Sequence, residues 1–257
     1  MKLKVLEKEK LKATFVIEGI TEALANTIRR FAMNEVPAMA IGTVSIQKNN
    51  SALYDEMLAH RLGLVPLKTD LRSYKLKEEC VCKGKGCAQC TLILTLKAKG
   101  PGTVYSSQLE SKDPKVVPVH ENIPIVKLLK NQEIKLDATA VLGQGKNHAK
   151  FSPGLVYYRG YPTITIEKKS GIKKCIEASN NNLVEKGNQL VIKDIKKWNE
   201  SYEEVCENNG MKVTSSKEDF IFSLESWGQL QPKEMLVKAI DMFDDRLDEF
   251  AKLFKSM

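Results

Sequence analysis

Apolar residues recur at helical spacing between residues 21 and 36, which predicts an amphipathic helix. Thr21 is a suitable N-cap, Glu22 complements the positive end of the helix dipole, and Pro37 ends the helix. The pattern fits an ordinary core helix as well as a helix that faces a partner, and paired arginines beside the stripe favour a partner surface. The stripe consists of Leu24, Ile28, Phe31 and Ala32, and the arginines are Arg29 and Arg30.

A second helical pattern begins near Pro232, a favourable residue for the first turn of a helix. Its apolar positions alternate spacings of four and three residues, which is typical of a heptad seam. A single domain can bury such a seam internally, but a long stripe ending in phenylalanines favours contact with another helix or another chain. The seam consists of Leu236, Ile240, Phe243, Leu247, Phe250 and Phe254.

Outside these helices, alternating apolar residues and turn signals predict a series of strands. The expected strands lie within residues 3–20, 39–46, 91–97, 104–105, 116–117, 122–129, 133–142, 155–166 and 220–224.

Residues 51–67 predict a short helix, with Ser51 as its cap, Gly63 just beyond its end and Pro66 as a stop. A lone histidine such as His60 is more often a hydrogen-bonded structural residue than a catalyst, and no nucleophile or carboxylate pair is arranged with it. The expected buried face consists of Leu53, Met57, Leu58 and Leu62.

Composition restricts the class of protein. The chain has 257 residues, an apolar fraction of 42% and a net charge of +8, so it has enough residues for one to three globular domains. Its lysines are spread along the chain, which fits a solvated surface as well as a polyanion partner. No apolar run approaches the roughly 20 residues that span a bilayer, and the N-terminus lacks a signal core. We therefore expect a cytoplasmic protein.

Four of the six cysteines lie within eleven residues, and glycines between them permit tight turns. Two thiolate pairs on such a loop can close a tetrahedron around one zinc ion in a structural site, while Lys83 and Lys85 offset part of its negative charge. An iron–sulfur cluster uses the same ligands and is the alternative. Unliganded thiols are disfavoured because free cysteines are usually buried singly. The predicted ligands are Cys80, Cys82, Cys87 and Cys90.

Two other segments carry weaker signals. Residues 143–151 look superficially like a phosphate loop but lack the full P-loop pattern, so we expect a basic surface loop that contacts a partner.

Residues 170–217 are polar and resemble a small inserted module. Cys175 and Cys206 within it are too few for a metal site, and the expected cytosolic location argues against a disulfide between them.

Taken together, four motifs resemble the Rpo3 family of archaeal DNA-directed RNA polymerases. This family is similar to the third-largest subunit of RNA polymerase II and to the N-terminal domain of the bacterial alpha subunit. The motifs occur in the family's order over nearly the whole chain. They are Asn26–Arg30 with Glu35–Pro37, Ala59–Leu67, Gly143–Pro153 and Phe222–Gly228.

The resemblance implies an α+β fold. An alpha-subunit-like dimerisation domain, an antiparallel sheet with packed helices, is interrupted by a mostly-β second domain and a small ferredoxin-like or remnant third module. The implied dimerisation segments are residues 1–47, 153–169 and 218–257, the implied second domain is 48–152, and the third module is 170–217.

The resemblance also implies partners and a role. The helix at residues 21–36 would pair with subunit L, the C-terminal seam would belong to the same interface, and subunit N and the second-largest, catalytic subunit would dock on the assembled pair. The four cysteines occupy the place of the eukaryotic zinc loop. Under this resemblance the chain is a non-catalytic scaffold in a DNA-directed RNA polymerase and meets nucleic acid only through the complex.

Some archaeal members of this family carry iron–sulfur clusters in a ferredoxin-like third domain. The third module of this chain departs from their cysteine pattern. Cys206 matches the last cysteine of a ferredoxin run, but Lys196, Asn199 and Tyr202 stand where the earlier cysteines belong, and Ile176 replaces the proline expected after Cys175. We therefore expect the third module to lack an iron–sulfur cluster.

Two other functions remain as alternatives. A redox protein using the four-cysteine loop would absorb visible light, whereas a zinc protein is colourless. A free-standing nucleic-acid-binding protein would show salt-sensitive affinity as an isolated chain.

Overall fold

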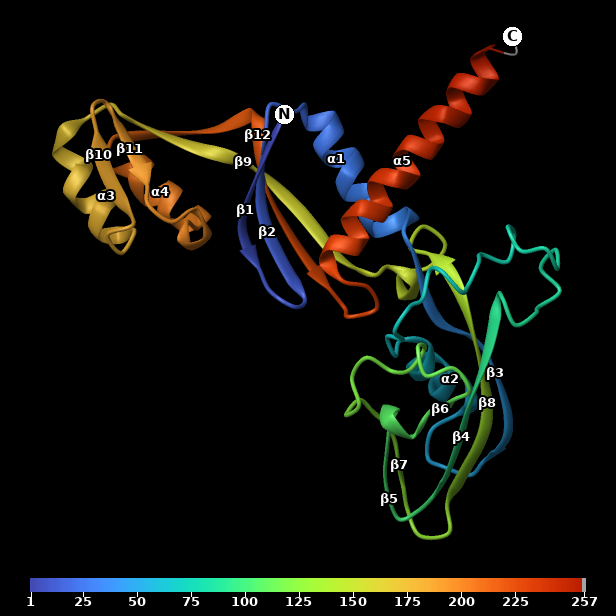
Figure 1. The fold of residues 1–257 in the computed structure, drawn as a ribbon. Helices are drawn as coiled ribbons and strands as arrows, with labels where there is room; N and C mark the ends of the chain where they lie inside the picture. Colours follow the sequence, from blue (N-terminus) through green and yellow to red (C-terminus); the bar gives the residue numbers. More distant parts are fainter. Residues whose placement is uncertain (256–257) are drawn as a thin grey trace. The chain divides into compact units, whose positions relative to one another are not determined.

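The computed structural model describes residues 1–255 as an α+β protein with antiparallel sheets (Figure 1), which confirms the fold class. The chain folds into two compact units, and each combines segments that are distant in sequence. The first unit comprises Met1–Lys8, Ala13–Asn26 and Tyr157–Ser223, and the second comprises Glu9–Lys12, Thr27–Val156 and the chain from Leu224 onward.

A six-stranded sheet forms the first unit, in the order β1-β2-β12-β9-β11-β10. Phe15 and Phe222 are both buried on it and stack with ring centroids 5.4 Å apart. The strands predicted within residues 3–20, 155–166 and 220–224 are confirmed. The strand bounds are β1 Lys2–Lys8, β2 Lys12–Glu18, β9 Gly154–Ile166, β10 Leu183–Lys186, β11 Gln189–Ile192 and β12 Met211–Ser226.

Strand β12 begins earlier than its hydrophobic pattern indicates. The polar stretch from Lys212 to Asp219 lacks a continuous apolar face, yet it lies beside β9, where an added Cβ at Gly160 would collide with the carbonyl of Ser216. Pairing with a long neighbouring strand satisfies backbone groups whatever the side chains are, and so extends the strand.

Helices α3, Ile172–Ala178, and α4, Glu200–Asn208, pack together in the first unit beside the β10–β11 hairpin. Cys175 and Cys206 form a disulfide between these helices, so the expectation of no bridge was wrong. Their Cα atoms lie 4.8 Å apart, a separation that a disulfide spans readily. The sequence could not show this because the two cysteines are 31 positions apart.

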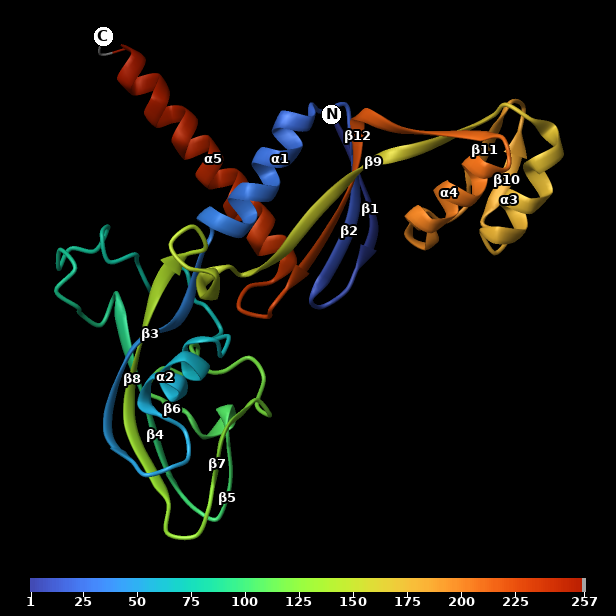
Figure 2. The ribbon, with the colours of Figure 1, turned by 180° about the vertical axis from the view of Figure 1, so that it is seen from behind.

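A four-stranded sheet, β3-β8-β4-β6, and a separate pair, β5-β7, form the body of the second unit (Figure 2). Their bounds are β3 Pro37–Asn49, β4 Thr91–Lys99, β5 Gly102–Tyr105, β6 Glu110–Ser111, β7 Pro124–Leu128 and β8 Glu133–Gln144. The predicted strands at 39–46, 91–97, 104–105 and 133–142 are confirmed, as is the strand within 122–129. Residues 116–117 are not a strand: Val116 is buried in a loop, where its side chain joins the core.

Helix α2, Asp55–Gly63, covers part of this core with Leu58 and Leu62, both fully buried. Several details of the predicted helix were wrong. Ser51 bonds to Asn49 rather than capping the helix, Met57 is exposed, and Gly63 is the last helical residue. His60 is exposed and, among the described residues, has no side-chain hydrogen bond that would make it structural.

Two further helices complete the chain. Helix α1, Glu22–Arg30, continues as a π-helical turn over Phe31–Glu35 and gives way to β3 at Pro37, as predicted. Helix α5, Pro232–Lys255, begins at the predicted residue.

Candidate metal centre and partner-binding helices

The four-cysteine loop lies between α2 and β4, and each cysteine pair closes a tight turn. The amide of Lys83 donates to the Cys80 carbonyl at 2.8 Å, and the amide of Cys90 donates to the Cys87 carbonyl at 3.0 Å. The turns also require left-handed backbone, which glycine adopts without strain. Positive φ angles occur at Lys83, Gly84 and Gly86.

The four sulfur atoms converge, lying within 4.8 Å of one another. The Sγ atoms of Cys80 and Cys87 are 3.5 Å apart, those of Cys82 and Cys90 are 3.5 Å apart, and those of Cys87 and Cys90 are 3.9 Å apart. Four thiolates bound tetrahedrally at about 2.3 Å from one zinc ion would be separated by roughly 3.8 Å. The predicted ligand set is therefore brought together with the spacing that a single metal ion needs.

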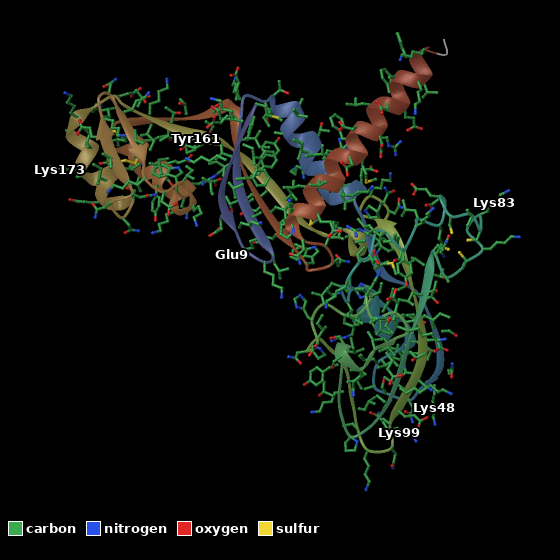
Figure 3. The ribbon with its side chains drawn as sticks, in the orientation of Figure 1. Glu9, Lys48, Lys83, Lys99, Tyr161 and Lys173 are labelled. Carbon is green, nitrogen blue, oxygen red and sulfur yellow. A yellow bond between two sulfur atoms is a disulfide. The ribbon has the colours of Figure 1, made fainter. Side chains whose placement is uncertain are left out.

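The protonation of the thiols is uneven. Burial raises the pKa of the Cys90 thiol. Burial also opposes ionisation of Cys82, but hydrogen bonds from the Cys80 and Cys90 thiols outweigh it and lower the pKa of Cys82 to about 6. A bound cation would displace the protons that the thiols carry. Figure 3 shows Lys83 extending outward from this loop, with sulfur atoms gathered inside the loop.

Gln144, Gly145 and Lys146 of the glycine-containing motif at 143–151 have structural roles. An added Cβ at Gly145 would collide with the Met33 carbonyl, so glycine permits the close approach. The Gln144 amide donates to the Glu35 carbonyl at 2.9 Å, and Lys146 forms a 2.7 Å ion pair with the Glu35 carboxylate. These contacts fasten the end of β8 to the turn after α1.

Helix α1 begins as predicted, since the amide of Leu24 donates to the Thr21 hydroxyl at 3.3 Å. Its most buried positions are Ala25 and, in the following turn, Ala32. The larger members of the predicted stripe, Leu24, Ile28 and Phe31, are half-buried, Arg29 is half-buried and Arg30 is exposed.

Helix α5 changes environment along its length. Met235 and Ala239 are buried, and the Phe243 ring contacts the Phe31 ring edge-on at 5.3 Å. Beyond Phe243 the helix extends past the other elements of its own unit (Figures 1 and 2). Phe250 and Phe254 are 66% and 69% exposed there.

The heptad seam is therefore packed at its start and exposed at its end. Leu236 and Phe243 are half-buried, while Ile240 and Leu247 are exposed like the terminal phenylalanines. The seam predicted from the sequence omits Leu253, which is 64% exposed and widens the apolar stripe. Its position next to Phe254 could have indicated that it belongs to the same exposed surface.

Comparisons with known proteins agree with this architecture. The family model described as the RNA polymerase Rpb3/RpoA insert domain matches residues 44–154, which include the four-cysteine loop. The DNA-directed RNA polymerase subunit Rpo3 of Methanosarcina acetivorans is 37% identical over 264 residues, covering 100% of this chain and 99% of the relative. The chain belongs to the Rpo3 family.

Other Rpo3 relatives match over nearly the same extent. Rpo3 of Methanothermobacter thermautotrophicus is 38% identical and Rpo3 of Pyrococcus horikoshii is 36% identical, each covering 97% of this chain and at least 96% of the relative. The resemblance found in the sequence motifs is thus confirmed, and the chain has a role in DNA-directed transcription. Among residues 1–255, no helix has both the length and the apolar character needed to span a membrane.

Proposed function

We propose that this chain is a non-catalytic assembly subunit of an archaeal DNA-dependent RNA polymerase. In this proposal it pairs with subunit L through α1 and α5, and the pair then docks subunit N and the second-largest subunit. The observation that carries the proposal is the exposed half of the α5 seam. A run of Ile240, Leu247, Phe250 and Phe254 in contact with water is unfavourable, and burial against another polypeptide removes that cost.

The distribution of metal-binding groups supports a scaffold role. Within the part of the chain that the structure describes, the four cysteines are the only cluster of His, Cys, Asp or Glu able to share a metal ion. Nucleotidyl transfer depends on metal ions held by carboxylates, so we place that chemistry on another subunit.

We further propose that the four cysteines hold one structural zinc ion. Three pairs of the sulfur atoms are 3.5 to 3.9 Å apart and all four lie within 4.8 Å of one another, which suits one tetrahedral ion. The cysteines of a four-iron cluster each bind a different iron and lie farther apart. The ion would tie the loop to the start of β4 and leave no open position for a substrate. In the third module, the disulfide uses both cysteines, which supports the expected lack of a cluster there.

The proposed domain arrangement follows the family. Residues 1–47, 153–169 and 218–257 would form the dimerisation domain, 48–152 the inserted domain and 170–217 the third module.

Co-expression of this chain with subunit L from the same genome tests the proposal. We expect a one-to-one heterodimer by light scattering, with the α5 amides beyond Phe243 protected from hydrogen exchange only in the complex. A monomer that stays monodisperse in the presence of excess subunit L would contradict the proposal.

A further inference from the structure

Residues from three of the sequence motifs line a cavity of about 420 Å³ in the second unit. These motifs are Ala59–Leu67, Gly143–Pro153 and Phe222–Gly228. One wall comes from the residues after α2, a second from the 3₁₀ turn Ala149–Phe151, and a third from the loop after β12. The lining residues are Leu64, Pro66, His120, Ile123, Ala149, Lys150, Ser152, Ser226, Trp227 and Gln229.

Hydrogen bonds hold these walls in place. The amide of Trp227 donates to the Pro153 carbonyl at 3.0 Å, and the amide of Val119 donates to the Pro66 carbonyl at 2.9 Å. The buried side chain of Gln229 donates to the Met39 carbonyl at 3.0 Å. The cavity is therefore preformed, and binding need not first order its walls.

The cavity carries a positive charge without a counter-ion. The Lys150 ammonium donates to the Ile41 carbonyl at 3.0 Å and lies 5.2 Å from the centre of the Phe151 ring. Among the described residues no carboxylate lies within 4.0 Å of it, and no lining residue is acidic. Burial lowers the pKa of Lys150, and an arriving carboxylate would reverse that effect.

The remaining surface of the cavity is mainly apolar. Trp227 is 45% exposed and Leu64 is 54% exposed, although both residues lie in tightly hydrogen-bonded segments. Exposed tryptophan beside a pocket is typical of an anchor point in a protein interface. A nucleic-acid backbone would need several cations in a row, whereas this cavity presents one lysine among apolar walls.

We propose that this cavity docks a segment of another polymerase subunit that places an apolar side chain against Trp227 and Leu64 and a carboxylate on Lys150. This assignment rests on the proposed scaffold function and gives it a second interface, separate from the α5 seam. It also gives the basic loop at residues 143–151 a specific recognition role.

The test uses polymerase reconstituted from this chain, subunit L and the remaining subunits of the same organism. Lys150→Glu should leave subunit L bound but reduce recovery of one further subunit at least tenfold, and Trp227→Ala should act in the same direction. Lys127→Glu is the matched control, because Lys127 is exposed on β7 of the same unit and outside the cavity. We expect it to behave like the wild type.

A photo-crosslinking residue at position 64 identifies the occupant in the assembled enzyme. We expect a crosslink to a segment of another subunit in which Asp or Glu adjoins an apolar residue, and exchange of that acid for lysine should rescue Lys150→Glu. Full subunit recovery with Lys150→Glu, or a crosslink only to a second copy of this chain, would overturn the inference. Loss of subunit L from the wild-type preparation would instead refute the scaffold function itself.

Discussion

The ring of Phe31 meets the ring of Phe243 edge-on, with centroids 5.3 Å apart and an interplanar angle of 68°. This contact joins the turn after α1 to the middle of α5. Met235 and Ala239 before Phe243 are buried against their own chain, whereas every seam residue after Phe243 is exposed. Phe243 is thus the last seam residue that packs on its own chain, although Ile240 before it is already exposed.

The exposed seam should determine heterodimer formation. Replacing Leu247 and Phe250 with aspartate should weaken binding of subunit L by more than about 100-fold, because each buried anchor in an interface contributes roughly 2 kcal/mol or more. Since both residues are exposed in the isolated chain, its thermal stability should change little. Calorimetric titration measures the affinity. Lys252→Asp, on the same helix but off the seam, serves as the control, and equal loss with this variant would argue against a specific seam.

Acidic residues flank the seam at helical spacing. Asp241, Asp244 and Asp248 are exposed, and none of them forms an ion pair with the described residues. In a chain of net charge +8, such a stripe favours a partner helix with basic residues beside its apolar face. Changing all three to lysine should slow association with subunit L and remove most of its salt dependence, as measured by stopped-flow kinetics at increasing salt.

A matched triple variant on α4 controls for the change in net charge. Glu200, Glu204 and Glu207 are also exposed, and their replacement by lysine should leave the association rate within about twofold of the wild type. If both triple variants slow association equally, long-range charge rather than the stripe accounts for the effect.

The metal site should hold one zinc ion per chain. Elemental analysis of anaerobically purified protein should detect zinc and no iron, and the protein should be colourless. Cys82→Ser should reduce zinc content at least tenfold and make the loop between α2 and β4 sensitive to protease, because the ion links its two turns. Cys175→Ser should retain zinc, since that cysteine lies outside the cluster. Visible absorbance with stoichiometric iron would contradict the zinc assignment.

Stability should depend on pH through Asp70, which precedes the cysteine loop. The Lys115 ammonium, which donates to this carboxylate at 2.9 Å, holds the pKa of Asp70 well below its usual range, with help from the Ser73 hydroxyl. Because the folded pKa is below the unfolded value of about 3.9, the carboxylate stabilises the native state above that pH. This stabilisation is lost as the pH falls from about 4 toward the folded pKa.

The Asp70→Asn variant isolates this contribution. It should be less stable than the wild type at pH 7, and the difference should shrink as the pH falls below 4, as denaturant unfolding at several pH values can measure. A difference that stays constant between pH 7 and pH 3 would show that Asp70 acts through packing rather than charge.

Local patterns were enough to predict the elements whose causes are local. The N-cap at Thr21, the end of the helix before Pro37 and the start of α5 at Pro232 depend on neighbouring residues, so the sequence determined them. The four cysteines were also predictable as one group, because eleven residues with glycines between the pairs can bring the sulfurs together whatever surrounds the loop.

Only the tertiary structure decided what depends on contacts between distant segments. Strand pairing extended β12 into a polar stretch, and the packing of α3 on α4 joined Cys175 to Cys206. The approach of three separate loops left Lys150 in an apolar cavity without a carboxylate beside it. Periodicity identified the seam on α5 but could not show that every seam residue after Phe243 is exposed, because burial depends on where the rest of the chain packs.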